Sequence, residues 1–279
     1  MYKYKNPLTK EDVLTEEDVL NYANINNYDL KEKIKEEESR LTGLFLESRT
    51  SLDEFYKNVM LDYSKEIVAF IEQDYKKILN DNIIDKLRNL SIIYKDKDKF
   101  PKISKNGKKP EAYASYEKGE VYFPSLSSIR DINKTNEEEN IIKLIRKQEQ
   151  VLIHEIFHLV SKNSFDKQEF KYNDEQIGEY KPGILFTEAV VEKSARDFAT
   201  KHNLFYHPDL SYMPYVQSLE KFMEIYGIQN NSQLFDVPFD KIIQIASEEE
   251  QQQYYDFETN HILQSYGRTD LISEKSKSR

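Results

Sequence analysis

The chain has 279 residues, which is long enough for one large domain with or without a smaller helical companion. Hydrophobic residues make up 38% of the chain and charged residues 32%, and 15 Phe and 20 Tyr are available for packing, so disorder throughout is not expected. The net charge of -10 argues against nucleic acid and acidic membranes as partners, and the lack of cysteine restricts any metal site to His, Asp and Glu ligands.

The amino-terminal residues do not resemble a targeting signal. MYKYKNPLTKEDV has no apolar core of the length that a secretory signal needs, and no run elsewhere approaches the length of a membrane span. As written, the chain is expected to be cytoplasmic and without a membrane partner. It would be secreted if a signal peptide had been removed.

Residues 9–80 show helical spacing. Apolar side chains such as Val13, Leu41 and Phe55 recur among Glu and Lys, which predicts two to four amphipathic helices. We therefore expect a helical region over residues 1–80 and a second domain over residues 81–279. No linker rich in Gly or Pro separates them, so one continuous domain is equally compatible with the sequence.

Three short strands are expected next. LSIIY at 90–94 is typical of a buried strand, and AYASY at 112–116 with GEVYF at 119–123 predicts a hairpin that turns around Glu117, Lys118 and Gly119. Pro124 should end the second hairpin strand.

Helical patterns fill most of the remaining chain. The apolar spacing predicts helices over about 136–161, 184–202, 214–226, 239–246 and 249–263. Because the strands precede these helices, we expect an α+β fold with a small, mostly antiparallel sheet followed by a helical carboxy-terminal part.

The chemistry is concentrated in VLIHEIFHLV at 151–160. His154 and His158 are four residues apart, so on a helix both imidazoles project from one face and can bind a single ion. Glu155 lies beside them, where a carboxylate can take a proton from water without binding the metal. A buried helix with two hydrogen-bonded histidines is the simpler alternative, but two of only five histidines occur in this spacing.

HEIFH resembles the signature of the zincin metalloproteases, and FTEAVVEKSA at 186–195 resembles the glutamate helix of their gluzincin branch, to which thermolysin belongs. The resemblance implies one Zn²⁺ per chain, held by His154, His158 and Glu188, with Glu155 as the catalytic base. It also implies that Glu192 supports a zinc-binding histidine. The alternative for Glu192 is an exposed helical residue paired with Arg196, four positions away.

Other acidic residues compete with Glu188 for the role of third ligand. Asp174, Glu175 and Glu179 are closer in sequence to His158, but they stand in a segment rich in Lys, Asn and Gly that is typical of a loop. Glu188 stands in a predicted helix with a buried face, which suits a site of fixed geometry.

The resemblance leaves two features of the cleft open. The gluzincin strand that lines the substrate cleft corresponds to GEVYF, which could equally be a core hairpin strand with Val121 and Phe123 inward. Gluzincins also steady the oxyanion with His or Tyr, and the candidates here are Tyr206, His207, Tyr212 and Tyr215.

The sequence therefore predicts a zinc-dependent hydrolase that cleaves peptide bonds in a peptide or protein substrate. The alternative is a zincin-fold binding or regulatory module in which the zinc site is structural or occluded. Glu155 favours the enzyme, because a purely structural zinc site does not need that carboxylate.

Overall fold

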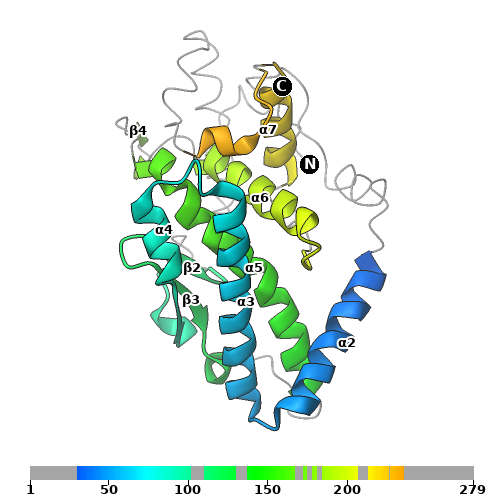
Figure 1. Cartoon of the computed structure of the whole chain (residues 1–279). Helices are drawn as coiled ribbons and strands as arrows, with labels where there is room; N and C mark the ends of the chain where they lie inside the picture. The colour runs from blue at the N-terminus through cyan, green and yellow to red at the C-terminus, as the bar shows by residue number, and fades with distance from the viewer. Residues whose placement is uncertain are drawn as a thin grey trace, which may run out of the picture.

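The computed structural model describes residues 30–101, 110–129, 137–166, 172–174, 178–180, 184–206, 213–225 and 227–235. Most of this part is helical, and Figure 1 shows the helices grouped around α5 with a small sheet at one side. The helices are α2 (Leu30–Ser48), α3 (Leu52–Tyr75), α4 (Asp81–Arg88), α5 (Glu137–Asp166), α6 (Ile184–Lys201) and α7 (Met213–Ile225), with short 3-10 turns at Lys97–Lys99, Leu126–Ser128 and Asn231–Leu234. The strands are β1 (Ser91–Lys95), β2 (Tyr113–Ser115), β3 (Glu120–Pro124), β4 (Tyr172–Asp174) and β5 (Gly178–Tyr180).

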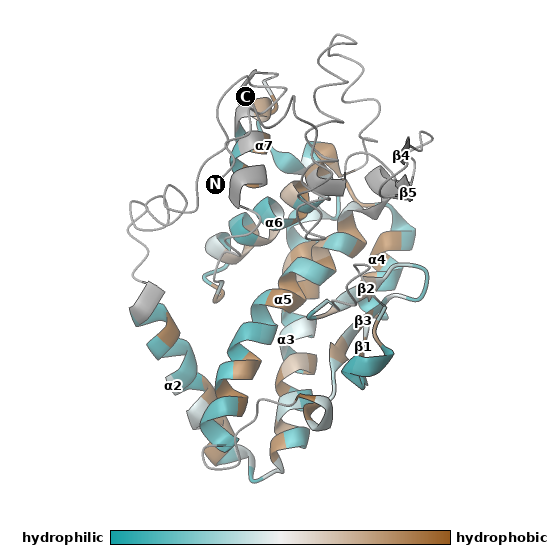
Figure 2. Ribbon diagram, turned by 180° about the vertical axis from the view of Figure 1, so that it is seen from behind, coloured by the Kyte–Doolittle hydropathy of each residue, from teal (hydrophilic) through white to brown (hydrophobic). Residues whose placement is uncertain are grey.

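α5 is the central element. It packs against α6, α3, α2 and α4 and also contacts β2 and β3. Its buried residues include Ile145, Leu152 and Ile156, which join one hydrophobic cluster with side chains from α3, α4, α6 and α7. Figure 2 shows the hydrophobic residues along α3 and α5 in the middle of the molecule. The core therefore includes residues on both sides of position 80.

The helix ends follow from local sequence signals. Ser51 caps α3 by accepting a hydrogen bond from the Glu54 N–H, and Asn80 caps α4 by accepting one from the Ile83 N–H. Arg49, with a φ of 52°, lies in the short link between α2 and α3. Asn203 has a φ of 54° just beyond α6, a conformation that Asn tolerates and that often ends a helix.

The three-stranded sheet has the order β1-β3-β2 and is mixed, since β1 is parallel to β3 and β2 is antiparallel to it. The hairpin between β2 and β3 is present as predicted, and its turn ends at Gly119, whose φ of 64° favours glycine. The parallel pairing departs from the expected mostly antiparallel arrangement, although β4 and β5 form a separate antiparallel pair. Local patterns predict strands but do not reveal which strands become neighbours.

GEVYF forms the central strand of this sheet, and the proposal that it lines a substrate cleft is wrong. β3 is paired on both sides, so neither of its edges can bind an extended peptide. Val121 and Phe123 are fully buried, which agrees with the core-hairpin alternative. LSIIY is half-buried rather than buried, because β1 lies at an edge of the sheet.

The long helices lie where the apolar spacing predicts them. α5 extends five residues beyond the predicted end at Ser161, and α6 and α7 differ from the predicted ranges by one residue at some ends. The helices expected over 239–246 and 249–263 fall outside the described residues. These findings support a broadly α+β, mostly helical fold.

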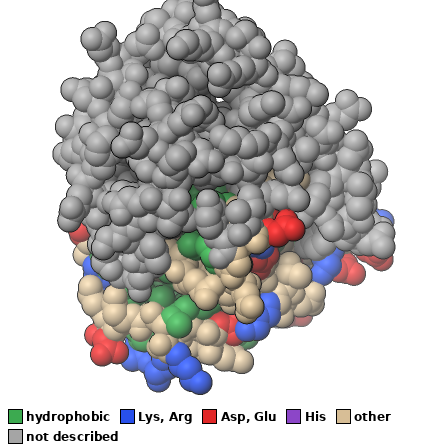
Figure 3. All heavy atoms as spheres, turned by 90° about the horizontal axis from the view of Figure 1, so that it is seen from above, with side chains coloured by type: hydrophobic (Ala, Val, Ile, Leu, Met, Phe, Trp, Pro, Cys, Tyr) green, Lys and Arg blue, Asp and Glu red, His purple; other side chains and the backbone are tan. Residues whose placement is uncertain are grey.

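The described part of one face carries charged and hydrophobic side chains together. In Figure 3, acidic and basic side chains are interspersed over the described part of the face that is seen from above. Among the described helices, none is both long and apolar enough to cross a bilayer.

Candidate metal centre

α5 presents the two motif histidines on one side because its other sides are buried. Ile153, Ile156 and Phe157 are fully buried, whereas the side chains of His154 and His158 remain 12% and 26% exposed. The spacing of four residues places the imidazoles one turn apart. Both rings are therefore fixed by the buried helix and still accessible to solvent.

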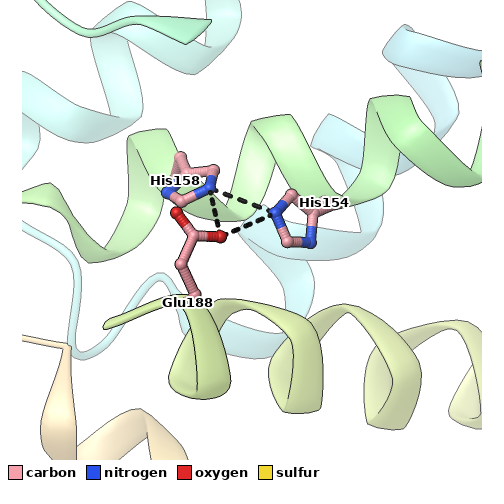
Figure 4. Close-up of side chains that lie close together, drawn as sticks. All are labelled: His154, His158 and Glu188. Atoms are coloured by element: carbon pink, nitrogen blue, oxygen red, sulfur yellow. Dashed lines mark hydrogen bonds and ion pairs between the residues drawn. The ribbon is translucent and has the colours of Figure 1, made fainter. Parts of the chain in front are cut away.

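α6 supplies the third residue. Ala189, Val190 and Phe198 are buried, as predicted, and they hold α6 against α5. Glu188 lies on the side of α6 that faces the two histidines, as Figure 4 shows. Its side chain is 23% exposed, so the carboxylate lies at the edge of the core rather than inside it.

Three potential ligand atoms converge between the helices. The two Nε2 atoms of His154 and His158 are 3.1 Å apart, and Oε2 of Glu188 lies 3.3 Å from the first and 3.4 Å from the second. Among the described residues, this is the only group of three His, Asp or Glu side chains close enough to hold one metal ion.

The triangle is close in size to one around a bound zinc ion, although the side between the two histidines, at 3.1 Å, is slightly short. Three ligand atoms bound to one zinc ion at about 2.0–2.2 Å with tetrahedral angles lie roughly 3.3–3.6 Å from one another. Oε2 of Glu188 is a buried atom without a hydrogen-bond partner of good geometry among the described residues, although both Nε2 atoms are near. A buried acceptor without a donor is unfavourable, and a cation would relieve it.

Glu192 orients His154 from the other side of the ring. One turn beyond Glu188, its Oε2 lies 3.0 Å from Nδ1 of His154, and its side chain is 2% exposed. A carboxylate at Nδ1 favours the tautomer with its proton there, which leaves the Nε2 lone pair directed at Glu188 and His158. The alternative of an exposed Glu192 is wrong because its side chain is buried, and Arg196 pairs with Glu220.

The electrostatics of the centre favour a positive charge. Burial alone would lower the pKa of His154, but its contacts with Glu188 and Glu192 raise it well above the ordinary value. Burial alone would raise the pKa of Glu188, but the charges and contacts of both histidines lower it strongly. The two carboxylates therefore favour a positive charge between α5 and α6, which a metal ion could supply.

Glu155 lies beside the cluster and is not part of it. Burial raises the pKa of Glu155 above its ordinary value, against the opposing charges of His158 and His154. Its carboxylate accepts a hydrogen bond from the backbone N–H of Ala114, which belongs to β2. A pattern of side chains carries no signal for this contact, because the donor is a backbone group.

The structure describes only some of the other candidates for the oxyanion residue and the third ligand. Tyr206 is described and is 3% exposed, with most of its ring in the core. His207 and Tyr212 fall outside the described residues, and Tyr215 lies in α7 with a side chain that is not described. Asp174 and Glu179 lie in β4 and β5 with side chains outside the described part, as does the whole of Glu175.

Comparisons with protein-family models, with curated protein sequences and with solved structures found no significant match.

Proposed function

We propose that this protein is a zinc-dependent hydrolase that cleaves peptide bonds, with the site organised as in gluzincins. The observation that carries the proposal is the convergence of two imidazole nitrogens and one carboxylate oxygen at 3.1–3.4 Å, with a further carboxylate, Glu155, beside them. His154, His158 and Glu188 would hold the zinc ion, and Glu192 would fix the orientation of His154.

A bound zinc ion would supply Lewis acidity and positive charge at the scissile carbonyl. Glu155 acts as the general base, because it lies next to the proposed zinc ligands but is not one of the three converging side chains. Its raised pKa suits a group that accepts a proton from water and later donates it to the leaving amine. The side chains of His154 and His158 are partly exposed, which leaves a path for water and substrate.

The number of converging ligands, together with the presence of Glu155, favours hydrolysis over a structural zinc site. A structural site is closed by four protein ligands, whereas three potential ligands converge here within the described part of the chain. Three protein ligands would leave a bound ion open to water. The gluzincin organisation draws its support from α6, which supplies both Glu188 and Glu192.

The test is incubation of the zinc-loaded protein with a diverse peptide library, with and without a zinc chelator. We expect cleavage products that disappear when the chelator is added and return when zinc is restored. A zinc-loaded protein that leaves the whole library intact would instead support the binding or regulatory module.

A further inference from the structure

β2 is an edge strand whose free side faces the candidate centre. It pairs with β3 along one side, with Tyr113 opposite Tyr122 and Ala114 opposite Val121. No other described strand pairs with it, and α5 packs against it. Consecutive N–H groups of an antiparallel strand point alternately toward the partner strand and away from it. Of the three backbone donors of β2, the middle one is therefore directed away from β3.

Ala114 is the residue whose donor is directed outward. The Gly119 carbonyl accepts from the Ser91 N–H of β1, so the backbone of Val121 also faces β1. Ala114 lies opposite Val121, so its N–H points away from β3. Its backbone N–H donates to the Glu155 carboxylate rather than to β3. The methyl group of Ala114 packs on the core, so the strand cannot rotate freely about its axis. The donor is thus a fixed part of the sheet, whereas Glu155 has a side chain with three rotatable bonds.

We propose that the backbone amide of Ala114 positions Glu155 for proton transfer, an inference that rests on the proposed function. One hydrogen bond from a rigid strand restricts the carboxylate to one orientation and still leaves acceptor sites for the proton of water. Ala114 is a positioning residue and does not touch the substrate in this role.

Because of this contact, the orientation of Glu155 depends on the register of the β2–β3 hairpin. A slip of one residue would turn the Ala114 N–H toward β3 and remove the donor from Glu155. The turn at residues 116–119 sets the register, and the Gly119 N–H bonds the Tyr116 carbonyl there. The orientation of the base therefore depends on the conformation of a turn that lies outside the site.

The contact can be measured without any activity. Amide hydrogen exchange followed by NMR should show that the outward-facing Ala114 N–H is protected in the wild type. In Glu155→Ala, which has no acceptor, exchange should be at least about tenfold faster, while in Glu155→Gln, whose amide oxygen can accept, protection should be retained. Equal exchange at Ala114 in the wild type and Glu155→Ala would overturn the proposal.

A kinetic test distinguishes positioning from mere folding. An ester link in place of the amide bond between Tyr113 and Ala114 removes the donor with little change of shape. We expect kcat to fall about tenfold to a hundredfold with KM within threefold and zinc content unchanged. An ester link in place of the amide bond between Lys76 and Lys77, in the exposed turn after α3, is the matched control and should retain kcat within about threefold of the wild type.

An ester variant that binds zinc and keeps the wild-type kcat would also overturn the proposal. If the wild-type protein cleaves no peptide, the proposed function fails, but the exchange experiment still decides whether Ala114 holds Glu155.

Discussion

His154 is contacted at both of its ring nitrogens. Glu192 lies at Nδ1, and His158 and Glu188 lie at Nε2. Two of these neighbours are carboxylates, so the ring is surrounded by acceptors. Metal binding would place a cation where the structure now brings lone pairs together.

Glu188→Ala should lose zinc. The substitution removes one of three ligand atoms, so we expect the zinc content to fall from about one per chain toward zero after dialysis. Glu179→Ala is the matched control, since Glu179 competes for the same role from its position in β5. Metal analysis of the two variants decides between them. Loss of zinc from Glu179→Ala but not from Glu188→Ala would reject the ligand assignment.

Glu192→Gln should weaken zinc binding less severely. The amide can still lie against Nδ1 of His154, but it carries no charge to polarise the ring, so a loss of about 10–100-fold in affinity is expected. A competition assay with a fluorescent zinc chelator measures this change. An affinity equal to that of the wild type would show that the 3.0 Å contact does not support the ligand.

The residues of the centre could be predicted to different extents. His154, Glu155 and His158 follow from spacing on one helix, which is a local property. Glu188 and Glu192 required a resemblance, since 30 and 34 positions separate them from His158. The donor at Ala114 could not be predicted, because it is a backbone group placed by strand pairing.

At the scale of elements, α6 is connected to α3 as well as to α5. His202, just beyond α6, stacks on Phe70 of α3 with a ring distance of 4.1 Å, and its Nε2 lies 2.8 Å from Asp74. Lys201 pairs with the same carboxylate, whose side chain is 6% exposed. This contact fixes the end of α6 opposite Glu188.

Asp74→Asn should destabilise the fold in a pH-dependent way. Burial alone would raise the pKa of Asp74, but hydrogen bonds from Lys201 and His202 lower it below the ordinary value. A depressed folded-state pKa stabilises the protein above the unfolded value of about 3.8, and this contribution is lost as the pH falls through the folded-state pKa. We expect a loss of about 1–3 kcal/mol at pH 7 that shrinks below about pH 4.

Urea unfolding at several pH values measures the difference between Asp74→Asn and the wild type. Asp62→Asn, on the same helix with an exposed partner, Lys65, is the control and should change stability little at any pH. A difference for Asp74→Asn that does not depend on pH would contradict the account.

The helices could be predicted more completely than the sheet. α5 and α6 have apolar spacing that is visible in the sequence, because a helix is stabilised by contacts among near neighbours and one buried face. The parallel pair of β1 and β3 has another strand, β2, between its members in the chain. Its pairing is decided by long-range packing, which a single-sequence pattern does not contain.

At the scale of the whole molecule, the candidate ion would connect two helices of one core. α5 and α6 belong to the same hydrophobic cluster, and the ligand atoms lie where the two helices face each other. A ligand that binds the folded state alone shifts the unfolding equilibrium toward that state.

Removal of zinc should therefore lower Tm. Free zinc at a hundredfold excess over its Kd contributes about 2.7 kcal/mol to the free energy of unfolding, so a chelator should cause a measurable drop by calorimetry. Glu188→Ala should unfold at the same temperature with and without the chelator. A chelator-induced drop of equal size in this variant would place the metal elsewhere.

The most direct measurement is peptide hydrolysis by zinc-loaded Glu155→Gln compared with the zinc-loaded wild type. Gln is similar in size to Glu but cannot accept the proton, so the variant should keep one zinc per chain and the wild-type Tm. We predict that it loses at least about a hundredfold in kcat. Wild-type hydrolysis by Glu155→Gln would contradict the claim that this carboxylate is the base.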